Sequence, residues 1–427
     1  MAIINEKQSP LIKKIRKFFK TLGPGLITGA SDDDPSGIAT YSIAGAKAGY
    51  ATLWSALFTF PLMAAIQEMC ARIGLVTCHG LAGILKRYYS KKLLYLTAFL
   101  MFGACSINIG ADLSGMAAAT NLILPLPYYK YIYSIIYAGL IVWLLINFSY
   151  RAIAKILKWL TLFLFTYILA LFFAKPSWLD ILQNTFVPKI EFTKDYLLLL
   201  VAILGTTISP YLFFWQASEE TEEEKEELRQ KHLKKVIISK NRLRHMREDV
   251  TAGMLFSNLV MYFIIATTAA TIFKSGITGI ETAEQAAEAL RPLAGQAAYL
   301  LFALGIIGTG LLAIPVLAGA AAYVLAETFG WREGLNKHFH QAKAFYLVII
   351  FSVGLGFLIN FFSVSAMALL FYAAVIYGLI SPFLIALIMH IANNKKIMGR
   401  FTNGRLANSL GVVAFVLISL AIIGLFI

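Results

Sequence analysis

The sequence is poor in charge and in cysteine. Only 14% of its 427 residues are Asp, Glu, Lys or Arg, whereas about a quarter is usual in soluble domains. The three cysteines are odd in number and lie in or near apolar segments. They therefore predict buried thiols rather than a disulfide framework or a metal motif. No grouping of nucleophile and base stands out, so an enzyme is not expected.

Long apolar runs, by contrast, are abundant. Hydrophobic residues make up 59% of the chain and the mean hydropathy is +0.72. Runs of about 20 apolar residues recur, and each is long enough to cross a hydrocarbon core. The sequence therefore predicts an all-α membrane protein with eleven transmembrane helices. We place these spans at 21–47, 50–76, 93–123, 128–148, 152–174, 195–217, 250–273, 296–328, 343–363, 365–391 and 407–427.

The 37 Lys and Arg residues are unevenly distributed between the predicted loops. With a cytoplasmic N-terminus, 29 of them fall on the cytoplasmic side, which is the positive-inside pattern. The net charge of +14 then reflects topology and contact with anionic lipid, and we expect no nucleic-acid partner. We predict a multi-pass protein of a bacterial-type plasma (inner) membrane, with the basic segment 1–20 inside, the C-terminus outside, no signal peptide and no obligate protein partner.

The stretch SDDDPSGIAT, residues 31–40, interrupts the first predicted span. Proline removes a backbone donor and breaks the helix here. A carboxylate at mid-bilayer costs at least about 2.5 kcal/mol, and Asp32, Asp33 and Asp34 also repel one another. A divalent cation held by carboxylates, carbonyls and hydroxyls would satisfy them, and oxygen ligands suit Mg²⁺, Ca²⁺ or Mn²⁺. Alternatively, Asp32 or Asp33 caps a half-helix or faces a water-filled vestibule instead of contacting the ion.

A second break, GTTISPY at residues 205–211, interrupts the sixth span. Spans one to five (21–174) and six to ten (195–391) thus form two sets of five, and the odd number requires inverted topology. Broken helices at corresponding positions of two halves indicate a transporter site. Span 407–427 stands outside the repeat. The hydrophilic segment 218–249 is predicted to form amphipathic helices in a solvated cytoplasmic connector.

The two breaks resemble motifs of the Nramp family of divalent-metal transporters, and more closely its Nramp-related magnesium transporter (NRMT) branch. The family's first-span signature Asp-Pro-Gly-Asn, continuing Ile-Ala-Thr, aligns with residues 34–40. Its sixth-span signature Ala-Thr-Val-Met-Pro-His aligns with residues 206–211. A third similarity lies at 107–123, where the family's third-span Asp is retained as Asp112.

The resemblance implies a LeuT-like fold and a set of metal-site residues. Family members bind transition metals with the Asp, the Asn, an Ala carbonyl and the Met thioether. The corresponding residues are Asp34, Gly37, the Thr206 carbonyl and Ser209, to which we add Asp33. Because a hydroxyl replaces the soft sulfur, the substrate is expected to shift towards Mg²⁺, with Mn²⁺ still accepted. The metal is cargo, and no cofactor is expected.

The resemblance also bears on coupling and on the ion pathway. The family carries proton-transfer His residues on the sixth span and a Glu after the third-span Asp, but here the His residues are absent and Gly115 replaces the Glu. We therefore expect uniport without protons, with Asp32, Thr207 and Asp112 along the pathway. The alternatives are a proton-coupled Mn²⁺/Fe²⁺ symporter and, ranked lower, a transporter of small organic solutes. A non-transporting metal sensor is opposed by the lack of a sizeable soluble domain.

Overall fold

The computed structural model describes residues 24–157, 159–231, 238–277 and 279–426. Within these ranges all regular structure is helical. The predicted cytoplasmic segment 1–20 lies outside the described residues. Eight helical stretches in the described part of the chain are long and apolar enough to cross a membrane, which supports the prediction of a helical membrane protein.

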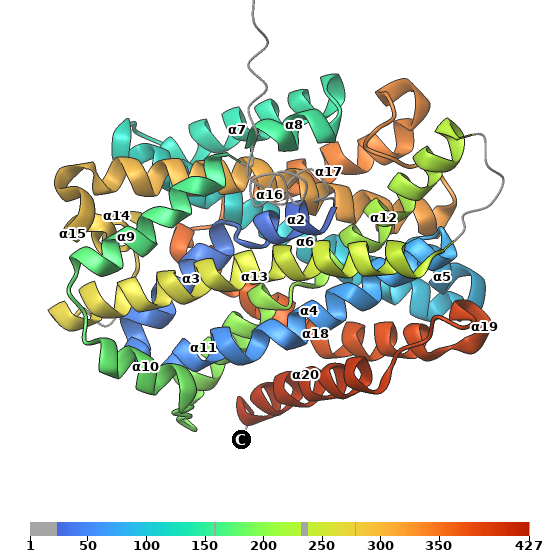
Figure 1. Ribbon diagram of the computed structural model, residues 1–427. Coiled ribbons are helices and arrows are strands. Elements are labelled where there is room, and N and C mark those ends of the chain that lie inside the picture. Colours follow the sequence, from blue (N-terminus) through green and yellow to red (C-terminus); the bar gives the residue numbers. More distant parts are fainter. Residues whose placement is uncertain (1–23, 158, 232–237, 278, 427) are drawn as a thin grey trace, which may run out of the picture.

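The long helices run side by side along a common direction, which is roughly horizontal in Figure 1. They are α4 (Leu53–Thr77), α6 (Lys91–Ile123), α7 (Tyr129–Asn147), α13 (Lys240–Thr271), α16 (Ala298–Phe329), α17 (Lys343–Ile359), α18 (Ala366–Asn393) and α20 (Arg405–Gly424). Shorter helices join them: α5 (Leu81–Tyr88), α8 (Tyr150–Leu157), α9 (Thr166–Phe173), α10 (Trp178–Phe186), α14 (Ala283–Ala287), α15 (Arg291–Ala294) and α19 (Lys395–Met398).

The described residues of each predicted span are largely helical, and besides the two expected breaks the fifth span is also interrupted. Over 152–174 the chain forms the end of α8, a 3₁₀ segment at Leu160–Phe165 and α9. The prediction rested on an apolar run. Hydropathy does not distinguish an α-helix, with i→i+4 hydrogen bonds, from a 3₁₀-helix, with i→i+3 hydrogen bonds. The total of eleven spans stays a prediction, since eight stretches meet the length and composition expected of a span.

Both predicted breaks are present. Helix α2 (Pro24–Asp32) stops and α3 (Pro35–Ala48) begins after two residues. Helix α11 (Lys194–Thr207) likewise gives way to α12 (Pro210–Gln230). In each case the proline is the first residue of the second helix, where its missing N–H would have no intrahelical partner anyway. The residue before it is extended, with φ −70° and ψ 171° at Asp34 and φ −74° and ψ 118° at Ser209.

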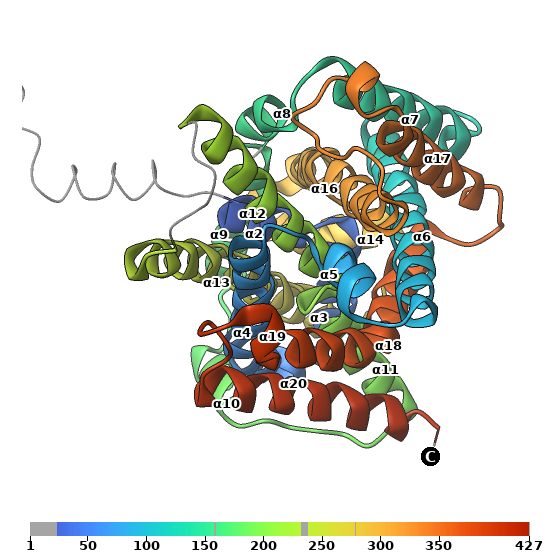
Figure 2. The ribbon, with the colours of Figure 1, turned by 90° about the vertical axis from the view of Figure 1, so that its right-hand side faces the viewer.

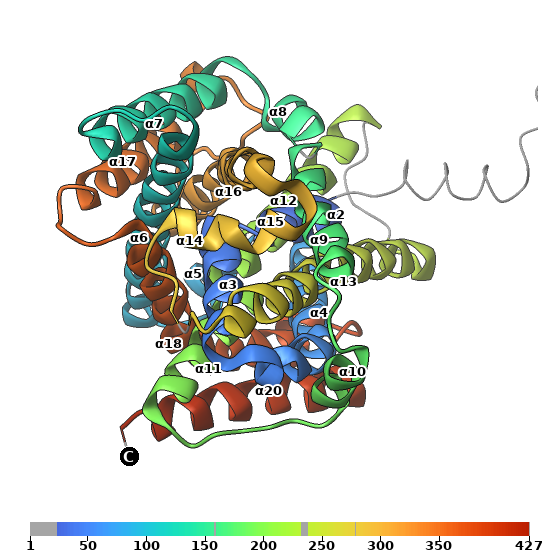
Figure 3. The same ribbon diagram turned by 90° about the vertical axis from the view of Figure 1, so that its left-hand side faces the viewer.

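The end-on views place α3 near the middle of the bundle, whereas α7, α17 and α20 lie at its periphery (Figures 2 and 3). The first break is therefore enclosed by other helices. This position is required physically, because unwound backbone at membrane depth is tolerated only where protein or a polar cavity surrounds it.

Helix α13 packs along both halves of the first broken helix. Its Gly253 backbone approaches α2 so closely that a Cβ on Gly29 would lie 2.1 Å from the Gly253 carbonyl oxygen. Further along, a Cβ on Gly45 of α3 would lie 1.9 Å from Thr268 Oγ1. Glycine at these positions permits the close approach of helix backbones that is typical of membrane proteins. The contacts on both sides of the break mean that α13 spans it.

The acidic part of the predicted solvated connector is instead a continuation of α12, and several of its carboxylates are buried, including Glu219, Glu220 and Glu224. The last turns of α16 and the segment that follows α16 provide partners for this part of α12. Tyr323 OH donates to Glu222 Oε1 over 2.7 Å, and Lys225 Nζ lies 3.4 Å from Glu333 Oε1. The sequence could not show this packing, because the partners lie about a hundred residues away.

Candidate functional site

Asp34 lies between the two halves of the first broken helix, and its carboxylate accepts hydrogen bonds from three donors. Its Oδ1 accepts hydrogen bonds from Ser36 Oγ and from the Gly37 N–H, each at 2.7 Å. Its Oδ2 accepts a hydrogen bond from Asn108 Nδ2 of α6, also at 2.7 Å. Asp34 is therefore the N-cap of α3 and also presents an oxygen to a neighbouring helix.

Asp32 connects the two breaks directly. Ser209 Oγ, which precedes Pro210 in the second break, lies 3.1 Å from Asp32 Oδ1 and 2.5 Å from the Thr206 carbonyl oxygen. Three oxygen-bearing groups from α2 and from the α11–α12 junction thus converge. Of the three aspartates, Asp32 is the one that is hydrogen-bonded to Ser209. The motif alignment makes Asp34 the principal metal ligand, and that role stays a prediction.

Asp33 is joined to the site through a residue of α13. Ser257 Oγ lies 2.6 Å from Asp32 Oδ2 and 3.2 Å from Asp33 Oδ1, while Asp33 Oδ2 is buried and has no hydrogen-bond partner among the described residues. A hydroxyl carries one proton and can donate to only one carboxylate at a time. The two neighbouring carboxyl groups are consequently short of donors.

Gly37 and Thr206 face each other across the breaks, whereas Thr207 turns away. A Cβ on Gly37 would lie 3.1 Å from Thr206 Oγ1, so Gly37 leaves little room for a larger side chain. Thr207 Oγ1 donates to the Ile203 carbonyl at 2.7 Å and lies 3.2 Å from Tyr41 OH. The hydroxyl predicted to line the pathway is thus held within its own helix and against α3.

Two polar residues of α6 lie one turn apart next to the first break. Asn108 and Asp112 are both fully buried. Asp112 makes no hydrogen bond within the described chain through either carboxylate oxygen. The motif comparison found Asp112 but missed Asn108 and Ser257. The signal that could have found them is a polar side chain at mid-span, which is costly in a membrane unless it has a partner.

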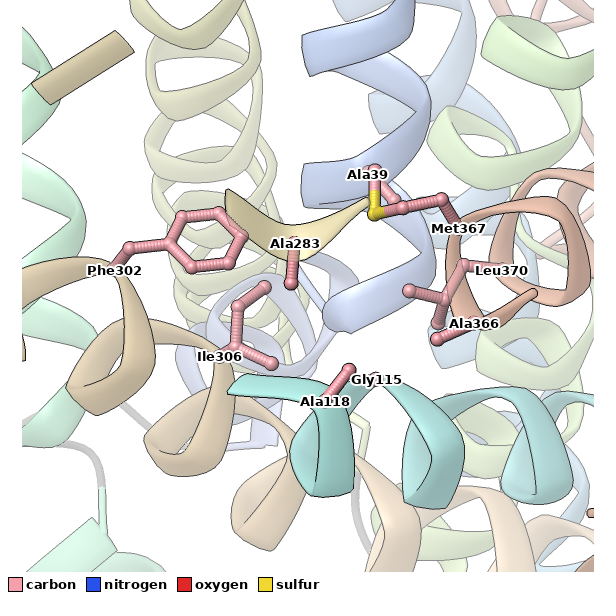
Figure 4. A pocket seen from close by; sticks show the side chains of 9 residues that line it. All are labelled: Ala39, Gly115, Ala118, Ala283, Phe302, Ile306, Ala366, Met367 and Leu370. Carbon is pink, nitrogen blue, oxygen red and sulfur yellow. The ribbon is translucent and has the colours of Figure 1, made fainter. Parts of the chain in front are cut away.

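The site is closed to solvent. Asp32 and Asp33 are 0% exposed, and Asp34 and Ser209 are 1% exposed. One turn beyond the break, an apolar pocket is lined by Ala39 of α3 together with side chains of α6, α14, α16 and α18 (Figure 4). In this view Ala283 of α14 lies between Phe302 and Met367. Small and apolar groups thus adjoin the polar groups on that side.

The donor set is one of oxygens. No group of three or more His, Cys, Asp or Glu side chains within the described ranges converges in a geometry that could hold a metal ion. A cation at the breaks would therefore need hydroxyl and carbonyl oxygens in addition to carboxylates. Ser209, Ser257 and the Thr206 carbonyl provide such oxygens around Asp32 and Asp33. Hard oxygen ligands suit hard cations.

A closed polar site between two interrupted membrane helices is typical of secondary transporters. The sequence profile of the Nramp family, described as natural resistance-associated macrophage protein-like, matches residues 25–427. The chain therefore belongs to the Nramp family.

Curated relatives cover most of the chain at low identity. A divalent metal cation transporter MntH of Caldanaerobacter subterraneus subsp. tengcongensis is 24% identical over 412 residues, or 95% of this chain and 92% of the relative. The MntH protein of Erwinia tasmaniensis is 28% identical over 326 residues, or 75% of this chain and 74% of the relative.

Solved structures share the fold. A manganese transporter of Eremococcus coleocola, in complex with an aromatic bis-isothiourea compound, matches with a TM-score of 0.74 at 17% identity, covering 97% of this chain and 87% of that one. Mhp1, a nucleobase-cation-symport-1 family transporter, matches with a TM-score of 0.52 at 14% identity, covering 95% and 92% of the two chains.

Proposed function

We propose that the chain is a divalent metal cation transporter that carries Mg²⁺, and also Mn²⁺, by alternating access without proton coupling. Its curated relatives are named divalent metal cation transporters. The proposal includes the NRMT assignment and a LeuT-like 5+5 inverted repeat (21–174 and 195–391) within eleven spans. It also includes a bacterial-type inner membrane location, with the N-terminus in the cytoplasm and the C-terminus outside.

The observation that carries the choice of Mg²⁺ is the position of Ser209. Its hydroxyl contacts Asp32 Oδ1 at 3.1 Å, at the place where the family alignment puts a methionine thioether. A site without sulfur loses the preference for soft transition metals. Mg²⁺ dehydrates reluctantly and keeps several waters, so it needs few protein ligands. Asp34 would be the principal ligand, with Asp33, Ser209 and the Thr206 carbonyl, and Asp32 beside them.

Flux measurements test the proposal. The purified protein in proteoliposomes is expected to admit Mg²⁺, to admit Mn²⁺ in competition with it, and to lose both activities in Asp34→Ala. The membrane potential supplies roughly 4.6 kcal/mol per 100 mV for a doubly charged ion. Asn360→Leu, a change at the buried residue that follows α17, serves as the control for general destabilisation. Absence of Mg²⁺ entry, or entry unaffected by Asp34→Ala, would refute the proposal.

One observation favours a second candidate, a proton-coupled Mn²⁺/Fe²⁺ symporter. Asp112 is fully buried, and its carboxylate oxygens have no hydrogen-bond partner among the described residues, which leaves both oxygens available to accept a proton. In the same proteoliposomes, metal-driven acidification of the lumen that Asp112→Asn abolishes would establish coupling. We expect no such acidification, because neither break (residues 31–40 and 205–211) contains a histidine, and the residue three positions after Asp112 is Gly115.

A further inference from the structure

Asn108 belongs to the contacts of the first break, although it comes from a different helix, α6. Its Nδ2 donates to Asp34 Oδ2 over 2.7 Å. A carboxylate is an acceptor, so it is the NH₂ group of the amide that must face Asp34. This fixes the orientation of the amide in the closed site and leaves the other amide atom, Oδ1, on the side away from the carboxylate.

The Oδ1 atom of Asn108 has no hydrogen-bond partner among the described residues, and the side chain is 0% exposed. A buried amide oxygen without a partner costs roughly 1–3 kcal/mol. Such a group is uncommon in a folded protein and calls for an explanation. Amide oxygens are also ordinary ligands of hard divalent cations.

No residue of α3 can provide an amide in its place. Helix α3 contains no Asn or Gln. Gly37 has no side chain, and a Cβ there would lie 3.1 Å from Thr206 Oγ1 and 3.3 Å from the Asp32 carbonyl oxygen, so a larger residue would require these neighbours to shift. Among the hydrogen bonds that Asp34 makes with the described residues, only the one from Asn108 comes from an amide side chain.

We propose that Asn108 is a ligand of the transported cation through Oδ1. Its NH₂ group faces Asp34 before the cation binds, and its Oδ1 atom faces the cation afterwards. This inference rests on the proposed function. When no cation is bound, the amide NH₂ group donates to Asp34 Oδ2. A doubly charged ion bound to Asp34 takes over that role, and rotation of the amide about χ2 turns Oδ1 towards the ion. The same side chain thus serves Asp34 without the cation and the cation when it is bound.

Two substitutions separate a ligand from a positioning donor. Asn108→Asp keeps an oxygen but removes the N–H₂ group, whereas Asn108→Leu removes both with little change in size. If Asn108 is a ligand, Mg²⁺ binding by the full chain in nanodiscs is at least tenfold weaker in Asn108→Leu. In Asn108→Asp it stays within about threefold of wild type or becomes tighter. If Asn108 only donates to Asp34 while no cation is bound, its loss leaves the cation-bound state unaffected. Asn108→Leu then binds Mg²⁺ at least as tightly as wild type, and the proposal is overturned.

Asn360→Leu is the matched control, because Asn360 is also a fully buried asparagine, bound to the carbonyls of Gly110 and Gly356. It is expected to bind Mg²⁺ like wild type at a similar loss of thermal stability. Wild-type binding of Mg²⁺ that is lost in Asp34→Ala but unchanged in Asn108→Leu overturns this inference alone. Absence of binding and flux in the wild type overturns the proposed function as well.

A spectroscopic measurement tests the proposal on the wild-type protein, so it does not depend on a site variant that folds. Wild-type protein labelled with ¹³C-asparagine is loaded with Mn²⁺ as the paramagnetic probe. It should show the strong electron–nuclear coupling expected of an amide carbon, Asn108 Cγ, whose oxygen coordinates the metal. The Asn360→Leu protein should show the same coupling. A spectrum with only distant ¹³C couplings would contradict the assignment.

Discussion

Ser257 Oγ of α13 lies 2.6 Å from Asp32 Oδ2 and 3.2 Å from Asp33 Oδ1, so one hydroxyl contacts the two consecutive carboxyl groups at which α2 ends and the first break begins. These residues are separated by more than two hundred positions in the chain. The contact brings α13 into the candidate site together with both breaks.

Removing this hydroxyl should make folding depend more strongly on a cation. In Ser257→Ala, Asp32 loses a buried hydrogen bond, which costs about 1–3 kcal/mol, and a bound divalent ion would compensate for it. We expect a lower midpoint of thermal unfolding without Mg²⁺ and a larger increase on adding Mg²⁺ than in wild type. Ser352→Ala, at a buried serine that bonds the Ile349 carbonyl, is the control. Equal Mg²⁺ responses of Ser257→Ala and wild type would be evidence against the prediction.

Selectivity should change when a thioether is placed in the second break. In Ser209→Met the hydroxyl at Asp32 is replaced by a soft sulfur ligand, which favours Mn²⁺ and Cd²⁺ over Mg²⁺. We expect the ratio of Cd²⁺ to Mg²⁺ affinity in competition binding to increase at least tenfold. Ser209→Ala removes the hydroxyl without adding sulfur, and an equal ratio in the two variants would show that sulfur is not the cause.

The contact between α2 and α13 should not tolerate a methyl group. A Cβ on Gly29 would lie 2.1 Å from the Gly253 carbonyl oxygen, and backbone cannot move aside cheaply. Gly29→Ala is therefore expected to lower the free energy of unfolding by about 1–3 kcal/mol. Gly139→Ala on α7 meets nothing within 4 Å and should be neutral or stabilising by up to about 1 kcal/mol. Denaturation of both variants in detergent compares them, and equal stabilities would contradict the packing.

The stability of the segment after α16 should vary with pH through Glu333. Burial raises the pKa of Glu333, and the neighbouring Lys225 opposes the shift in part. Since the pKa is higher in the folded than in the unfolded state, the contribution to stability is complete at low pH and is lost as pH rises through the folded pKa. Glu333→Gln, which stays neutral, should therefore gain stability over wild type as pH increases from 4 to 8. A difference in unfolding midpoint that does not change with pH would disprove this.

The breaks could be predicted from the sequence because their causes are local. Pro35 and Pro210 each lack a backbone donor, and in both cases the structure begins a new helix at the proline. The apolar runs likewise coincide with helices. Chain order could not reveal that α2 lies against α13, because that proximity depends on glycine contacts between distant segments.

The candidate site could be predicted only in part for the same reason. The aspartates and Ser209 belong to the breaks and are visible in the sequence as polar exceptions. Asn108 and Ser257 lie inside regular helices, where a single polar residue looks like an ordinary interhelical partner. What distinguishes them is that their atoms reach Asp34, Asp32 and Asp33, and only tertiary structure provides that information. The ligand roles stay predictions.

The continuity of α13 across an interrupted neighbour has a mechanical consequence. With 32 residues and a rise of about 1.5 Å per residue, the helix is roughly 48 Å long. Ser257, which contacts Asp32 and Asp33, lies about 17 residues from the Lys240 end. If α13 tilted as one rigid body about Ser257, a tilt of about 5° would displace that end by roughly 2 Å. A small rearrangement around the carboxylates would then produce a larger movement at the rim of the bundle.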